Sequence, residues 1–159
     1  MKKFILFLVG LIIGFIIFIP KTNLFFSGQK YLSNYNIFIN FKHLNSSLFT
    51  LNLDKVKIYY HGIDGINIDS IKFLPLLFIN KITLQDVNIL NNKANINLNY
   101  NIFTPFKINI DGLSNFGIIK GDINLKTKHL KVYILNLKNN KLKSFLKKDK
   151  QGYFYEQSF

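Results

Sequence analysis

Hydrophobic residues follow two different patterns along this chain, and the change comes near residue 35. Phe4 to Ile19 is an uninterrupted apolar run between Lys2-Lys3 and Pro20-Lys21. From Tyr35 onward, apolar and polar residues alternate, which is typical of strands with one apolar face. The pattern therefore predicts an apolar helix followed by a mainly β domain.

The apolar run is interpreted as an uncleaved signal anchor. A spanning helix needs about 20 apolar residues, and Pro20 and the stems of the flanking lysines extend the run toward that length. The lysines before it favour a cytoplasmic N-terminus. A cleaved signal peptide is the first alternative, although no pair of small residues follows at the usual spacing. A buried soluble helix is the second, and the all-round apolar surface disfavours it. The anchor side chains are Phe4, Leu6, Leu8, Leu11, Ile13, Phe15, Ile17 and Ile19.

Four segments follow from these patterns. Residues 1–21 form the anchor or transmembrane helix, and residues 22–34 a juxtamembrane amphipathic segment, helical or irregular. Residues 35–138 form the β domain. Residues 139–159 form a basic helix, indicated by Leu142, Phe145 and Leu146 at helical spacing, and an aromatic tail.

A change of phase recurs within the predicted strands. In Leu51–Ile58 two apolar residues in alternation are followed by the polar pair Asp54-Lys55 and then by apolar residues in the opposite phase. Ile66–Phe73 and Ile82–Ile89 repeat the pattern. Such a shift indicates a β-bulge in a continuous strand or a turn in a broken one. The regular spacing of the three segments favours successive strands of a meander.

Glycine and asparagine mark the expected connections, because both tolerate positive φ. Turns are predicted at 61–65, 91–93, Asp111-Gly112 and Gly121-Asp122. Leu74 to Asn80 is expected to cross one end of the sheet as a short helical or irregular piece, since proline does not fit a central strand. Further strands are expected at 94–103, 105–110, 116–125 and 130–137.

Composition narrows the function classes. The formal net charge is +13, yet the basic residues are all lysine, and nucleic-acid readers rely on arginine for bidentate contacts. Abundant Lys, Asn and Ile indicate an AT-rich coding sequence, so nucleic acid is not the expected partner. The chain has no cysteine, which excludes disulfides and thiol chemistry.

No residue pattern points to catalysis. His43, His61 and His129 are far apart, and no spacing suggests a metal site. Asp64 and Asp69 are the best candidates for a carboxylate pair, but aspartate in such places more often serves turns. The chain is therefore predicted not to be an enzyme and to need no cofactor or metal.

Apolar side chains exceed what one face of a sheet requires. Phe38, Tyr59 and Phe106 stand on nominally polar faces, which indicates a second layer, a partner or an apolar ligand. A closed sandwich or barrel core is the alternative. The candidate apolar surface comprises Phe38, Phe49, Ile58, Phe73, Leu76 and Phe78.

The chain has an anchor, bulged strands, the apolar element Pro75-Leu76-Leu77 and a late strand with the pattern of Gly117, Gly121 and Leu125. In these features it resembles AsmA-like envelope proteins, and among them the GspN group of type II secretion. The resemblance implies a periplasmic β-groove tied to the inner membrane that handles lipid or supports an envelope assembly. The expected fold is thus mainly β, a transmembrane helix followed by a bulged antiparallel sheet or groove, AsmA-like or jelly-roll-like, with one or two short helices.

The expected location is the bacterial inner membrane, as a single-pass protein with its C-terminal domain in the periplasm. The expected activity is binding of lipid, another apolar ligand or an envelope partner. The alternative is a structural subunit of a type II secretion, DNA-uptake or lipopolysaccharide-transport complex, and periplasmic nucleic-acid binding is the least favoured.

Overall fold

The computed structural model describes residues 2–76, 78–89, 92–138 and 140–159. Three helices are present in this part of the chain, α1 (Lys2–Phe18), α2 (Lys21–Ser33) and α3 (Asn140–Lys143). Of the two forms expected for residues 22–34, helical or irregular, the structure has the helical one, α2. Leu77 of the predicted crossing and Asn91 of a predicted turn lie outside the described residues.

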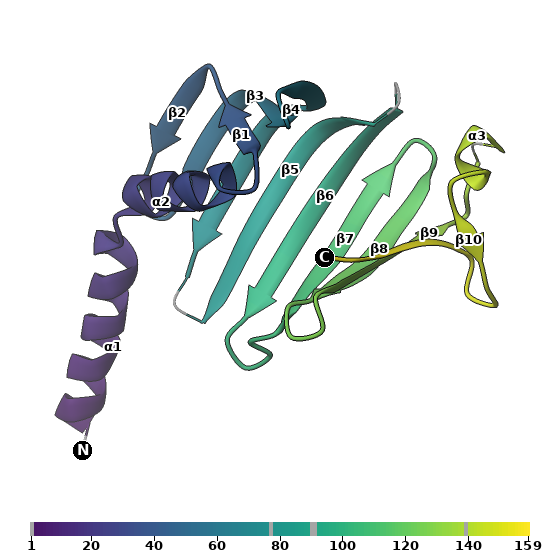
Figure 1. Ribbon diagram of the computed structural model, residues 1–159. Helices are drawn as coiled ribbons and strands as arrows, with labels where there is room; N and C mark the ends of the chain where they lie inside the picture. The colour runs from purple at the N-terminus through teal and green to yellow at the C-terminus, as the bar shows by residue number, and fades with distance from the viewer. Residues whose placement is uncertain (1, 77, 90–91, 139) are drawn as a thin grey trace.

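The strands form one open antiparallel sheet, so the jelly-roll-like variant with two sheets is not observed (Figure 1). The spatial order is β1-β3-β4-β5-β6-β7-β8-β9-β11-β10, with β2 paired to β3, so consecutive strands from β3 to β9 are neighbours. The strands are β1 (Ile37–Asn40), β2 (His43–Ser46), β3 (Leu51–Tyr60), β4 (Ile63–Pro75), β5 (Ile79–Ile89), β6 (Asn92–Asn101), β7 (Lys107–Ser114), β8 (Gly117–Asn124), β9 (His129–Leu135), β10 (Lys147–Lys148) and β11 (Tyr153–Ser158).

The predicted phase change is a bulge inside continuous strands, not a turn. Lys55 in β3 and Asp86 in β5 have left-handed backbone, with φ 54° and 50°. Leu53 pairs with Ile71 and Val56 with Ile68, so β3 and β4 share the shift. The shift ends between β5 and β6, where two residues of β5 lie opposite Asn95 alone. As a result, the apolar residues before and after each bulge lie on one face of the sheet.

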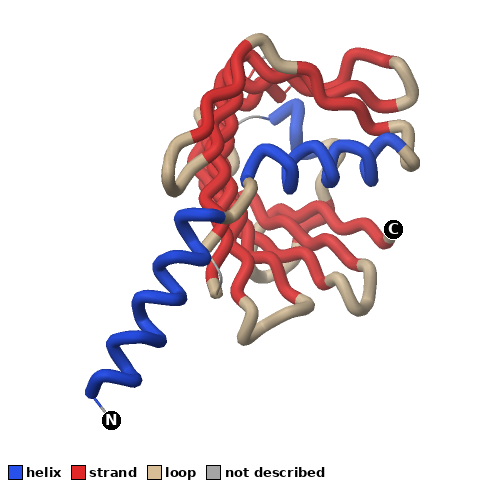
Figure 2. Tube along the Cα trace, turned by 90° about the vertical axis from the view of Figure 1, so that its left-hand side faces the viewer, coloured by secondary structure: helices blue, strands red, loops and turns tan. Residues whose placement is uncertain are grey.

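The sheet curls strongly, and α2 lies on its concave side (Figure 2). Glycines permit the close approach of neighbouring strands on this side. A Cβ at Gly112 would lie 2.7 Å from the carbonyl oxygen of Asn95. A Cβ at Gly121 would collide with the carbonyl oxygen of Lys131 and lie 2.8 Å from Val132 Cα. Glycine inside a strand commonly marks such close backbone approach or a bend.

Two predicted turns are therefore wrong. Asp111-Gly112 lies within β7 and Gly121-Asp122 within β8, each paired on both sides. These glycines are needed for curvature and not for chain reversal. The observed reversals fall at Asn115-Phe116 and at residues 125–128.

Other boundaries also differ from the predictions. Leu74 and Pro75 still belong to β4 and Ile79 already belongs to β5, so the expected crossing element is only a short connection. The expected strand 105–110 begins at Lys107 and extends to Ser114. The aromatic tail is a strand, β11, that pairs with β9, and β2 was not predicted.

We expect Gly121→Ala to lower the free energy of unfolding by about 1–3 kcal/mol, because the new Cβ would force β8 away from β9. Gly28→Ala is the matched control, since a Cβ there meets nothing within 4 Å and alanine favours the helix. Thermal unfolding of the full chain in detergent, followed by circular dichroism, measures both. Equal stability of the two variants would contradict the role given to Gly121.

Candidate functional site

The concave face of the sheet is the candidate site. Cross-strand pairing places apolar side chains in continuous rows along it, because one register joins strand after strand. One row begins with Leu53 and Ile71 and continues through Leu84 and Ile96 to the far strands. We call the half-buried part of this face the apolar trough: Ile71, Leu84, Ile96, Leu98, Ile123, Leu130, Val132 and Ile134.

Along β5 to β8, burial decreases from one end of this face to the other, whereas Leu51 and Leu53 at the start of β3 are fully buried. We call the end with the His61-Gly62 turn the upper end, and the end with the connections after β2, β4, β6 and β8 the lower end. Near the upper end Val87, Ala94 and Ile119 are at most 5% exposed. Leu142 from α3 belongs to the same buried cluster, so α3 covers the concave face at this end. Toward the lower end, Tyr100, Ile108, Ile123 and Leu130 are only half-buried.

Helix α2 covers the concave face near β1. Phe25 packs against the core cluster and meets Phe41 edge-on, with ring centroids 5.7 Å apart. Gln29 Nε2 donates a hydrogen bond of 2.7 Å to the carbonyl oxygen of Ile39. The helix is thus held by the contacts of Phe25 and Phe26 with Phe41 and by one polar contact near the edge of the sheet. The described accessible surface is 11213 Å². A compact monomer of this mass would expose about 8,200 Å², and the exposed helix α1 contributes to the difference.

The structure does not gather the six residues of the predicted apolar surface into one patch. Ile58 and Phe73 are half-buried on the concave side, whereas Phe38 lies on the opposite face of β1 and is exposed. Phe49, Leu76 and Phe78 lie in connections at the lower end. That predicted surface is therefore replaced by the trough. The trough residues that lie outside the predicted surface follow the period-two alternation of β6, β8 and β9. That alternation identifies them as lining residues only once the pairing of these strands is known.

The predicted anchor residues Phe4, Leu6, Leu8, Leu11, Ile13, Phe15, Ile17 and Ile19 lie on α1 or directly after it, and none is buried. Helix α1 leaves the domain at the lower end (Figure 1). Lys21 is 4% exposed, and its Nζ lies 3.4 Å from the carbonyl oxygens of Ile17 and Ile19. A cation there satisfies carbonyls at the end of α1.

Among the described residues, no single helix has both the length and the apolarity of a membrane span, but α1 and α2 together do, with a 58° bend between them.

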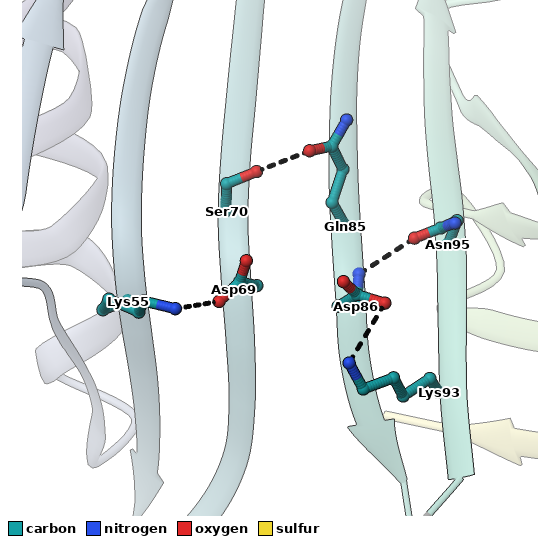
Figure 3. A network of polar contacts seen from close by, with 7 residues as sticks. All are labelled: Lys55, Asp69, Ser70, Gln85, Asp86, Lys93 and Asn95. Carbon is teal, nitrogen blue, oxygen red and sulfur yellow. Dashed lines mark hydrogen bonds and ion pairs between the residues drawn. The ribbon is translucent and has the colours of Figure 1, made fainter.

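The convex face carries a row of polar contacts over the bulges (Figure 3). Lys55 pairs with Asp69, and Lys93 lies 3.7 Å from Asp86. The backbone N–H of Asp86 donates to Asn95 Oδ1 at 2.9 Å. We call this set, with the Ser70–Gln85 hydrogen bond, the bulge ladder. It satisfies polar groups where the strand shifts phase, so its function is structural.

The bulge ladder also shifts the pKa of one acidic group. The hydrogen bond from Lys55, together with its positive charge, lowers the pKa of Asp69 below its ordinary value. Asp69 is exposed, so the effect on stability is small.

The histidines remain separate. His43 begins β2, His61 lies in the upper turn against Tyr60, and His129 begins β9. The part of the chain that the structure describes contains no group of three His, Cys, Asp or Glu side chains placed to hold a metal ion.

Comparisons with family models, curated proteins and solved structures found no significant match to this chain.

Asp69→Asn should remove a pH-dependent part of the stability. Because folding lowers the pKa of Asp69, its contribution is fully present above the unfolded carboxyl pKa of about 3.9. It is lost as the pH falls through the lower pKa of the folded state. Unfolding of wild type and variant should therefore differ at neutral pH and converge in acid.

Lys55→Gln should remove the same pH-dependent part of the stability, since it takes away the ion-pair partner of Asp69. Asp111→Asn is the control, an exposed aspartate on the same face for which the described residues show no ion pair. A constant difference between wild type and Asp69→Asn across the acid range would contradict the assignment.

Proposed function

We propose that this chain is an inner-membrane-anchored protein of the bacterial envelope. Its periplasmic β domain holds an acyl chain, or a ligand of similar shape, in the apolar trough. The main support is the gradient of burial along β5 to β8 of the concave face: this part is covered by α3 at the upper end and half-buried at the lower end, where α1 leaves. The resemblance to AsmA-like proteins supplies the location and the class of ligand.

The trough has the chemistry that an acyl chain requires. Its side chains are aliphatic, from Ile71 and Leu84 to Val132 and Ile134, and offer no charged group to pair with a polar ligand. Each CH₂ moved from water into such a surface contributes about 0.8 kcal/mol. An acyl chain that leaves the bilayer would therefore remain in an apolar environment inside the trough.

The anchor explains why such a surface stays near lipid. Helix α1 exposes only apolar side chains beyond its basic start, and Lys21 holds the bend that joins it to α2. A span completed by the residues that follow α1 would keep the lower end of the sheet at the bilayer surface. Single-pass insertion with the lysines of residues 2 and 3 in the cytoplasm places the sheet in the periplasm.

A purely structural subunit is the second candidate, and the open edges of the sheet are the place where a partner strand would add. The edge strands are short: β1 (Ile37–Asn40) and β2 (His43–Ser46) lie beside β3, and β10 (Lys147–Lys148) pairs with Tyr153 and Phe154 of β11. Short edge strands protect a sheet against pairing with other chains. The trough therefore favours the lipid proposal over edge docking.

The test compares two lysine substitutions in β8. Ile123 lies on the concave face in the trough, whereas Ile118 points to the convex face, and both are half-buried. Full-length wild type, Ile123→Lys and Ile118→Lys are purified from membranes in detergent, and bound phospholipid is measured by mass spectrometry. Because all three keep α1, lipid bound around the helix is the same in each.

We expect Ile123→Lys to lose the trough-bound phospholipid and Ile118→Lys to keep it, because a charge in the trough disfavours an acyl chain. Circular dichroism checks that both variants keep the sheet. Equal lipid in all three proteins would overturn the lipid proposal. Stoichiometric protein partners without lipid would favour the structural subunit.

A further inference from the structure

The connections at the lower end of the sheet carry exposed apolar side chains where turns are usually polar. We define the lower rim as Leu48, Phe78, Ile102, Phe103, Phe106 and Leu125, with exposed fractions from 42% to 79%. These residues come from the connections after β2, β4, β6 and β8.

Direct contacts hold three of these connections side by side. The backbone N–H of Ile102 donates to the carbonyl oxygen of Phe78 at 3.0 Å. The rings of Phe78 and Phe103 are stacked, with centroids 6.4 Å apart. Leu125 N–H donates to the carbonyl oxygen of Phe106 at 2.8 Å. The lower rim is therefore an ordered row.

The row continues to the tether. Leu48 and Ser47 line one hollow together with Ile17, Ile19 and Pro20, at the point where α1 ends. Both views place α1 and the lower connections at the same end of the sheet (Figures 1 and 2). Any bilayer that α1 enters is thus the surface nearest to the lower rim.

Lysines accompany the apolar side chains. Lys126 and Lys128 are exposed in the connection that also holds Leu125, and Lys81 is exposed near the start of β5. Exposed aromatic and aliphatic groups beside lysines suit the headgroup region of a bilayer with anionic lipid. A contiguous exposed apolar surface with a polar border commonly marks an interaction site.

We propose that the lower rim is a membrane-contact surface that inserts into the interface of the bilayer entered by α1. The occupant is an anionic phospholipid surface. This contact deepens the proposed function and rests on its anchor. With the rim seated, the open lower end of the trough meets the bilayer directly, so an acyl chain passes between them without crossing water.

The experiment uses the absence of cysteine from the chain, which lets a single introduced cysteine carry one label. Phe103→Cys reports the lower rim and Phe145→Cys is the matched control, since the two positions are 79% and 72% exposed. Phe145 follows α3, which closes the upper end of the sheet. Leu8→Cys reports α1. Each full-length protein, labelled with an environment-sensitive dye, is reconstituted into vesicles of phosphatidylethanolamine and phosphatidylglycerol.

The measurement is quenching by phospholipids that carry a nitroxide on the acyl chain. We expect several-fold stronger quenching and a blue-shifted emission for the label at residue 103 than for the label at residue 145. Equal, weak quenching at 103 and 145 with a quenched label at residue 8 overturns the lower-rim contact alone. An unquenched label at residue 8 overturns the anchor of the proposed function instead.

A second arm separates headgroup charge from apolar insertion. Quenching at residue 103 should fall in vesicles in which neutral phosphatidylcholine replaces phosphatidylglycerol. It should also fall in the original vesicles when Lys126→Gln and Lys128→Gln are combined. In both cases the attraction of lysine to anionic lipid is lost. Unchanged quenching in both would overturn the assignment of an anionic surface.

Discussion

The register that joins the bulged strands determines the rest of this structure. A strand with an uninterrupted period of two would send half of its apolar residues to each face, since Leu53 and Val56 are in opposite phases. Left-handed backbone at Lys55 and Asp86 corrects the phase, and the bulge ladder satisfies the polar groups around the correction. One face thereby becomes apolar across the sheet, and the other carries the bulge ladder together with a few apolar side chains such as Phe38 and Ile118.

A sheet with one apolar face must cover it or bend around it. Here it bends, and Gly112 and Gly121 remove the Cβ atoms that would otherwise collide with the neighbouring strand. The curl brings α2 and α3 over parts of the concave face, but two short helices cover too little of it. The trough is what remains, an apolar surface that the chain itself covers only at the upper end.

In our proposals, the placement of α1 explains why part of the core stays uncovered. Helix α1, the lower rim and the less buried half of the trough all lie at one end of the sheet. In our proposals these features act together: α1 holds the domain at the bilayer, the lower rim seats it, and the trough receives an acyl chain. Each step uses apolar area that folding of the domain alone does not bury.

Local patterns in the sequence were enough to predict the apolar helix, the mainly antiparallel strands and the phase change in β3. They left residues 22–34 as helical or irregular, and the phase change as a bulge or a turn. These features depend on residues close in the chain, because periodicity and phase are properties of neighbours. Tertiary structure alone decided the rest. Gly121 resembles a turn residue until the carbonyl oxygen of Lys131 is placed beside it, and the aromatic tail becomes a strand only because β9 offers an edge. The lower rim likewise exists only after pairing brings Phe78 next to Phe103, residues that no local pattern connects.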